Sequence, residues 1–254
     1  MTRPPQPQAP SDTPIARRSL VLGALLAPLA RARAQSQRDL TPAEQELVDR
    51  AAAVMGGVLD QFRSDDWVEK IEFSYDGASA PTEPRAPLQV GLLRRSYHVR
   101  QGSARWNQRI APLMPPMPAD GEMTPAAMQM MVRNRDKFRP LMDLWVEASF
   151  NESVSTHVAP PLPGNPDLHL PGVARAYRTA DGDGKPGRGA VLLFGDWSRA
   201  RWEADNGAWR YAFAHPPGSV VIENVQIHIE GAADRIDELL HAIDWRAVDT
   251  LIGH

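Results

Sequence analysis

Seven histidines, in a chain with no cysteine, are the side chains from which metal or acid–base chemistry would first be expected. They form neither an i, i+4 pair nor an H-x-H pair, so the spacing of a metal site is missing. His228 alternates with apolar residues, which predicts a place on the polar face of a strand. His157 lies in a polar run beside a proline-rich stretch, and it is the histidine that we assign to a ligand pocket.

Two short strings begin like motifs but lack the rest of the pattern. Asp181-Gly-Asp183-Gly starts like a calcium loop, but Lys185 and Leu192 stand where ligating carboxylates are needed. The sequence Gly-Asp-Trp-Ser, which ends at Ser198, lacks the second glycine of a nucleophile elbow. The first string therefore predicts a hairpin turn. A hydrolase gains no positive support, although a triad assembled by folding stays open.

Methionines are concentrated in the middle of the chain, where seven of the nine lie between residues 114 and 142. Thioethers are soft ligands that select Cu(I), so Met114, Met117 and Met123 are candidate copper ligands. Their spacing loosely resembles the Met-rich segments of periplasmic copper-handling proteins. The other methionines of the stretch fit the packing face of a helix. We predict no cofactor, with copper as the alternative.

Aromatic residues gather in the last third of the chain. An Asn-Gly pair at 206–207 between two alternating runs predicts a β-hairpin. Large aromatic side chains on such a hairpin can line an apolar groove for a ligand. The alternative is an ordinary aromatic core between the sheet and the last helix. The predicted ligand-binding residues are Trp197, Trp202, Trp209, Tyr211 and His157.

The first 34 residues contain the parts of an export signal. Arg17 and Arg18 precede an apolar run that ends at Ala30 and is too short to span a bilayer. Small residues at Ala32 and Ala34 then fit a cleavage site. We expect residues 1–34 to be removed, the alternative being an uncleaved amphipathic helix.

The arginine pair resembles a twin-arginine (Tat) signal, which directs export of folded proteins. Ala16 stands where that signal usually has Ser or Thr, and Leu20 stands where Phe is common. The resemblance implies a periplasmic or secreted protein, and it covers only this segment.

Charge and composition narrow the function further. Residues 1–34 hold five arginines and one aspartate, so their removal takes the net charge from −3 to about −7, with 23 basic side chains against 30 acidic ones. An acidic chain with no long basic run is a poor nucleic-acid binder. No second apolar run is long enough to span a bilayer, so we expect no transmembrane anchor after cleavage.

The remaining chain, residues 35–254, is predicted to form a single α+β domain. Helices are expected from Thr41 to about Arg63, from Thr124 through a break at Pro140 to Ala148, and over residues 232–243. Strands are expected over residues 68–75 and 88–100, and as a C-terminal β-meander within residues 172–230. The three helices would cover a mostly antiparallel sheet. This order of elements is similar to that of the Mog1/PsbP-like fold, in which a terminal helix covers one face of a meander.

These observations predict an exported, soluble, non-catalytic binding or accessory protein of the cell envelope. Its partner would be an unknown small ligand or an envelope protein, not a nucleic acid. Two other classes stay open: a hydrolase that uses a serine or a pair of carboxylates, and a Met-based Cu(I)-binding protein.

Overall fold

The computed structural model is built on a six-stranded sheet, and it describes residues 37–70, 80–81, 88, 90–115, 123–155, 168–180, 186–205, 207–216 and 218–253. Every pair of neighbouring strands in this sheet is antiparallel. In spatial order the strands are β2 (Trp67–Lys70), β4 (Val90–Val99), β5 (Asp143–Phe150), β11 (Asn224–Glu230), β8 (Pro186–Gly195) and β7 (Arg175–Ala180). With the helices described below, this confirms the α+β class and the mostly antiparallel sheet. Residues Gln37–His254 form one compact unit.

Two smaller sheets accompany the large one. The first has the order β6-β10-β9 and is made of β6 (Val154–Ser155), β10 (Ala208–Tyr211) and β9 (Ala200–Glu203). The second pairs β1 (Gln37–Arg38) with β3 (Ala80–Pro81). The meander expected in the last third is therefore divided between two sheets. The strands β7, β8 and β11 lie in the large sheet, whereas β9 and β10 lie in the three-stranded one. The short β9, with three of its four residues at least partly exposed, does not have the apolar faces that a central strand needs.

The helices on one face of the large sheet begin where the sequence predicts. The helix α2 (Pro42–Leu59) starts with a capping box: the backbone N–H of Glu44 donates to Thr41 Oγ1 at 3.3 Å, and the N–H of Thr41 donates to Glu44 Oε2 at 2.7 Å. The helix ends at Leu59, earlier than expected. After β11 come α4 (Ala233–Ala242) and the short α5 (Arg246–Asp249).

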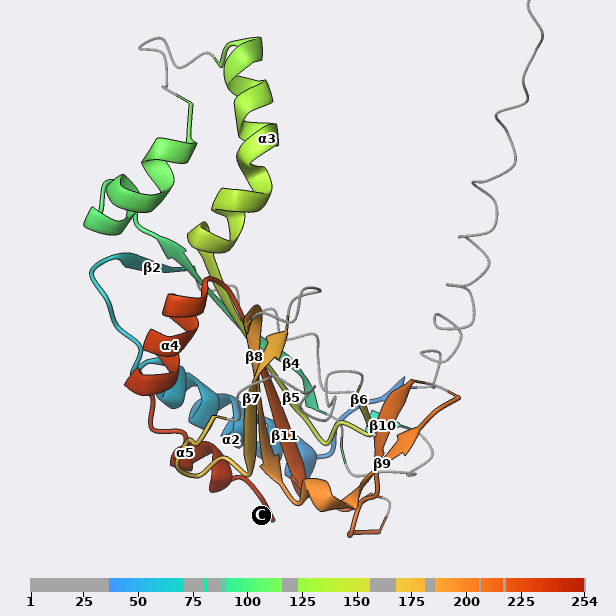
Figure 1. Cartoon of the computed structure of the whole chain (residues 1–254). Helices are drawn as coiled ribbons and strands as arrows, with labels where there is room; N and C mark the ends of the chain where they lie inside the picture. The colour runs from blue at the N-terminus through green and yellow to red at the C-terminus, as the bar shows by residue number, and fades with distance from the viewer. Residues whose placement is uncertain are drawn as a thin grey trace, which may run out of the picture. The chain divides into compact units, whose positions relative to one another are not determined.

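The hydrophobic core lies between these helices and the sheet. Alternate residues of the central strands point into it, and they meet the apolar stripes of α2 and α4. Figure 1 shows α2, α4 and α5 on one side of the large sheet and β6, β9 and β10 on the other. The strand residues of this core that are 0 % exposed are Leu144, Val146, Ala148, Ala190, Leu192, Phe194, Val225, Ile227 and Ile229.

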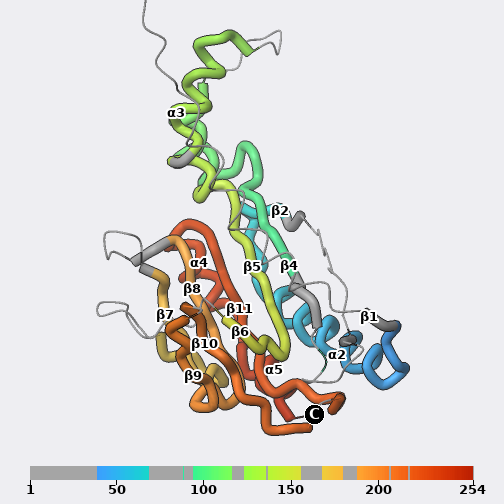
Figure 2. Tube along the Cα trace, turned by 90° about the vertical axis from the view of Figure 1, so that its right-hand side faces the viewer, coloured from blue at the N-terminus to red at the C-terminus, as the bar shows by residue number. Residues whose placement is uncertain are grey.

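The chain forms a strand from Asp143, so the expected continuation of the helix to Ala148 is wrong. The helix α3 (Pro125–Met142) contains Pro140 in its last turn and ends two residues later, and β5 follows at once. The reason is the alternate burial of side chains along β5, which places Leu144 and Val146 in the core. Helix α3 packs against the short turns η1 (Trp106–Ile110) and η2 (Ala111–Leu113) and against the near ends of β4 and β5. Figures 1 and 2 show it extending beyond those strand ends.

Candidate functional site

Polar side chains from three strands share one patch of the large sheet, on the face opposite the core. Arg94 on β4 is directly opposite Glu147 on β5, which is in turn opposite His228 on β11. Further along the strands, Trp145 on β5 is opposite Glu230 on β11. Directly opposite residues of antiparallel strands point to the same face with their Cβ atoms about 4.5–5.5 Å apart. The sheet therefore brings together five side chains from three segments that are far apart in the sequence.

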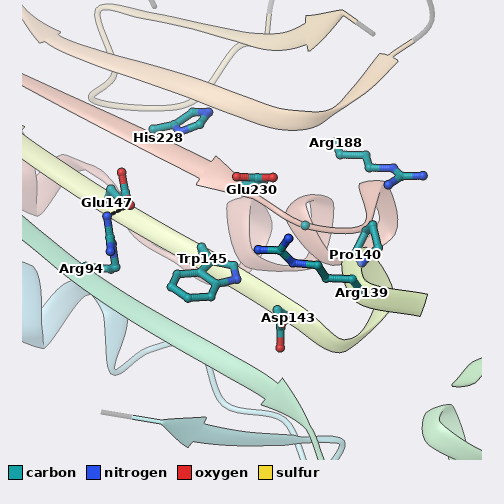
Figure 3. Close-up of a pocket in the computed structure, with 10 residues that line it drawn as sticks. Arg94, Arg139, Pro140, Asp143, Trp145, Glu147, Arg188, His228 and Glu230 are labelled. Carbon is teal, nitrogen blue, oxygen red and sulfur yellow. Dashed lines mark ion pairs between the residues drawn. The ribbon is translucent and has the colours of Figure 1, made fainter. Parts of the chain in front are cut away.

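A pocket of about 450 Å³ opens at this patch, and we call it the sheet pocket. Its volume lies within the range of sites for small organic ligands. The last turn of α3 and the ends of β8 and β11 supply the rest of its rim (Figure 3). The lining residues are Arg94, Arg139, Pro140, Asp143, Trp145, Glu147, Arg188, His228, Glu230 and Gly231.

One ion pair and one histidine–carboxylate contact hold one side of the pocket. Nη2 of Arg94 lies 2.5 Å from Oε1 of Glu147, and the same guanidinium is 5.8 Å from the centroid of the Trp145 ring. Nδ1 of His98 lies 2.6 Å from Oδ1 of Asp143. These four side chains are 18–36 % exposed, so water screens the ion pair of Arg94 with Glu147 only in part. Arg94 therefore fixes the position of Glu147, and Glu147 with Trp145 restrains Arg94 in return.

The other side of the pocket carries charges that a ligand can reach. Arg139, Arg188 and Glu230 are all exposed. Arg139 makes no ion pair with a residue that the structure describes. In Figure 3 its guanidinium extends toward the space between Glu230 and Trp145. An arginine can bind a carboxylate or phosphate through two parallel hydrogen bonds, and a carboxylate beside it can accept from a hydroxyl or ammonium group.

The four aromatic residues predicted to bind a ligand do come together, but at a different place. The rings of Trp197 and Tyr211 meet edge to face at 5.3 Å, and those of Trp202 and Trp209 lie 5.8 Å apart. They cluster around β9 and β10, where Trp197 and Trp209 pack against a small apolar group on β7 and β8. Trp202 is 52 % exposed. None of the four lines the sheet pocket, and His157 lies outside the described residues.

The predicted methionine ligands are only partly described. Met114 is half-buried and packs against the core, and Met123 is half-buried one residue before the N-cap of α3. Met117 lies outside the described residues. Within the described ranges, no three His, Asp or Glu side chains are grouped as a metal site would require. The copper site therefore stays a prediction.

Comparison with known proteins leaves this site to be interpreted from its own geometry. The chain matches no known protein family, no curated protein and no solved structure. The sequence placed His228 on a polar strand face but did not connect it with Arg94, Trp145 or Glu147. The alternation along β5 was the signal that could have shown this face.

Proposed function

We propose that this protein is an exported, non-catalytic binding protein of the cell envelope, and that its ligand occupies the sheet pocket. The exposed guanidinium of Arg139, directed toward the space beside Trp145 and Glu230, is the observation that supports this proposal. A binding site needs a few polar groups in fixed positions and a surface that excludes water. The ion pair of Arg94 with Glu147 supplies polar groups in fixed positions, and the ring of Trp145 supplies an apolar face.

The charges of the pocket favour a small organic anion that also carries a hydrogen-bond donor. Arg139 and Arg188 would bind its carboxylate or phosphate, and Glu230 would accept from its hydroxyl or ammonium group. The ring of Trp145 offers a flat face for the carbon skeleton. A hydroxy acid, an amino acid and a sugar phosphate all have this combination of groups.

Calorimetric titration of the purified chain with inorganic phosphate, malate and glucose 6-phosphate tests the proposal. We expect at least one of the organic anions to bind more tightly than inorganic phosphate, because only an organic anion reaches Trp145 and Glu230. Replacing Arg139 by Ala should weaken that binding by about tenfold or more, since a hydrogen bond to a charged group contributes about 1.5–3 kcal/mol.

The matched control is Arg135→Ala, which removes an exposed arginine of the same helix that does not line the pocket. Its affinity should equal that of the unmodified chain. Failure of all three compounds to bind, or equal affinities for the Arg139 and Arg135 variants, would contradict the proposal.

A carboxylate-based hydrolase is the second candidate, and the acidic side chains of the pocket favour it. Glu147 and Glu230 line the same pocket as His228, so acid–base chemistry has the groups that it needs. No serine lines this pocket, which leaves the serine version without support here. Turnover of nitrophenyl esters or glycosides that Glu230→Gln abolishes, while the organic anions still bind, would favour the hydrolase over the binding protein.

Export by the twin-arginine route rests on residues outside the described ranges and is proposed from the sequence alone. Within the described ranges, no helix is long and apolar enough to cross a bilayer. Fusing residues 1–38 to a reporter that works only when exported in the folded state should place the reporter outside the cytoplasm. Replacing both Arg17 and Arg18 by Lys should block this export, because that pathway recognises the arginine pair. Unchanged export of the lysine variant would contradict the route.

A further inference from the structure

One side of helix α3 exposes apolar side chains to water. The helix packs through its other side, where Ala127 and Phe138 are each only 9 % exposed. Met128 and Val132 are 54 % and 71 % exposed. Residues four apart lie one above the other on a helix, so these two side chains form a continuous apolar strip.

The same helix is basic in a chain that is acidic overall. It carries four basic residues and one acidic residue, so its net charge is +3, whereas the whole chain has −3 and the residues outside α3 therefore sum to −6. All four basic side chains are exposed, and none makes an ion pair with a described residue. These residues are Arg133, Arg135, Lys137 and Arg139.

The apolar strip and part of this charge lie on one face. Arg135 and Arg139 follow Val132 at i+3 and i+7, which is the spacing of a single helical stripe. Arg139 also lines the sheet pocket. One stripe of α3 therefore ends at the mouth of the pocket, and it consists of Met128, Val132, Arg135 and Arg139. About 10 Å of helix separates Val132 from Arg139.

We propose that this stripe of α3 docks the protein on an anionic lipid bilayer. Each Lys or Arg near an anionic surface is attracted to it, and exposed apolar side chains enter the boundary between headgroups and acyl chains. The acidic remainder of the chain is repelled by the same surface, so the protein docks through α3. Arg139 then lies at the level of the headgroups with the pocket beside it. The docking does not depend on the proposed ligand site.

Charge decides between the bilayer and a second copy of this chain. Two α3 helices placed face to face would bring arginines of the same sign together, which is unfavourable unless an acidic surface lies between them. An anionic bilayer supplies the complementary charge. The apolar area of two side chains is also small for a stable dimer, whose interface usually buries well over a thousand Å² in total.

Cosedimentation of the full chain with lipid vesicles tests this docking. Vesicles of phosphatidylcholine with 30 % phosphatidylglycerol are compared with pure phosphatidylcholine. We expect at least about fivefold stronger partitioning onto the anionic vesicles, falling as salt rises from about 0.05 to 0.5 M because salt screens exposed charges. Val132→Glu and Arg135→Glu should each reduce partitioning by about fivefold or more. Every variant retains the apolar run before Ala30, so the differences report on α3.

Matched controls come from the three-stranded sheet of β6, β10 and β9. Val154→Glu changes another exposed valine, 37 % exposed on β6, and Arg201→Glu changes an exposed arginine on β9. Both should partition like the unmodified chain, and circular dichroism should show the same fold in all variants. Equal partitioning onto neutral and anionic vesicles, or partitioning that the α3 variants leave unchanged, overturns the proposal. A third result would also overturn it: the chain does not bind vesicles, and sedimentation velocity detects a dimer that Val132→Glu converts to monomers.

Discussion

Replacing Asn151 by Ala should lower the free energy of unfolding by about 3–5 kcal/mol. Asn151 follows β5 directly, is fully buried and has a positive φ of 54°. Its Nδ2 donates to the carbonyl oxygens of Leu88 and Val221 at 2.8 and 2.7 Å, and its Oδ1 accepts from the N–H of Glu223 at 2.7 Å. Alanine would leave two buried backbone groups and one partly buried one without these partners, each at a cost of about 1–3 kcal/mol, and would tolerate the left-handed backbone less well.

Denaturant unfolding measures this loss. The control is Asn107→Ala, because Asn107 is exposed and its side chain donates a single hydrogen bond, to the carbonyl oxygen of Gly102 at 3.2 Å. That variant should lose less than about 1 kcal/mol. Asn151→Asp keeps the acceptor but places a buried carboxylate oxygen against the carbonyl oxygens of Leu88 and Val221, so it should lose at least as much as Asn151→Ala. An Asn151→Ala loss no larger than that of Asn107→Ala would contradict the expectation.

The turn at Asn151 matters for the pocket because it lies where β5 and β11 begin to pair. The N–H of Asn151 donates to the carbonyl oxygen of Asn224 at 2.9 Å, and the next pair along is Phe150 with Val225. That register places Glu147 opposite His228. A slip of one residue would turn every side chain of a strand to the other face, so the turn helps to keep the polar residues out of the core.

Local signals in the sequence predicted the ends of helices well. Thr41 and Glu44 form a capping box whose two hydrogen bonds need only neighbouring residues, and the structure contains both. Thr124 likewise caps α3, its Oγ1 accepting from the N–H of Ala127 at 3.1 Å. Such contacts are determined within one helical turn, so they can be recognised without knowing the fold.

The sheet pocket could not be recognised in this way because it depends on contacts distant in sequence. Leu144 and Ala148 are spaced by four and fit a helix, yet Val146 between them shows the period of a strand. Only the pairing with β4 and β11 decides between the two patterns. A helix predicted over these residues gives Trp145 and Glu147 no neighbours from other strands. The pairing of β11 with β8 could not be predicted either, because β9 and β10 lie between these two strands in the sequence.

The protein should lose stability steeply between about pH 10 and pH 12, because two buried tyrosines must stay neutral. Tyr177 and Tyr211 are 2 % and 5 % exposed. Burial raises the pKa of Tyr177 from 10.0 to about 12. Burial, together with the nearby carboxylate of Glu223, raises the pKa of Tyr211 to about 12 as well. Above pH 10 the unfolded chain releases protons that the folded chain retains, so this contribution is complete below pH 10 and is lost as the pH rises through 12.

Each tyrosine should lower the free energy of unfolding by about 1.4 kcal/mol per pH unit in this window, and the pair by up to about 5 kcal/mol across it. Denaturant unfolding at intervals from pH 8 to pH 12 measures the slope. Phenylalanine cannot ionise, so Tyr177→Phe and Tyr211→Phe should each flatten the curve by one tyrosine, and the double variant by both. The double variant also reports the part that lysines and arginines contribute at high pH. A double variant as steep as the unmodified chain would show that the tyrosines ionise without unfolding the protein.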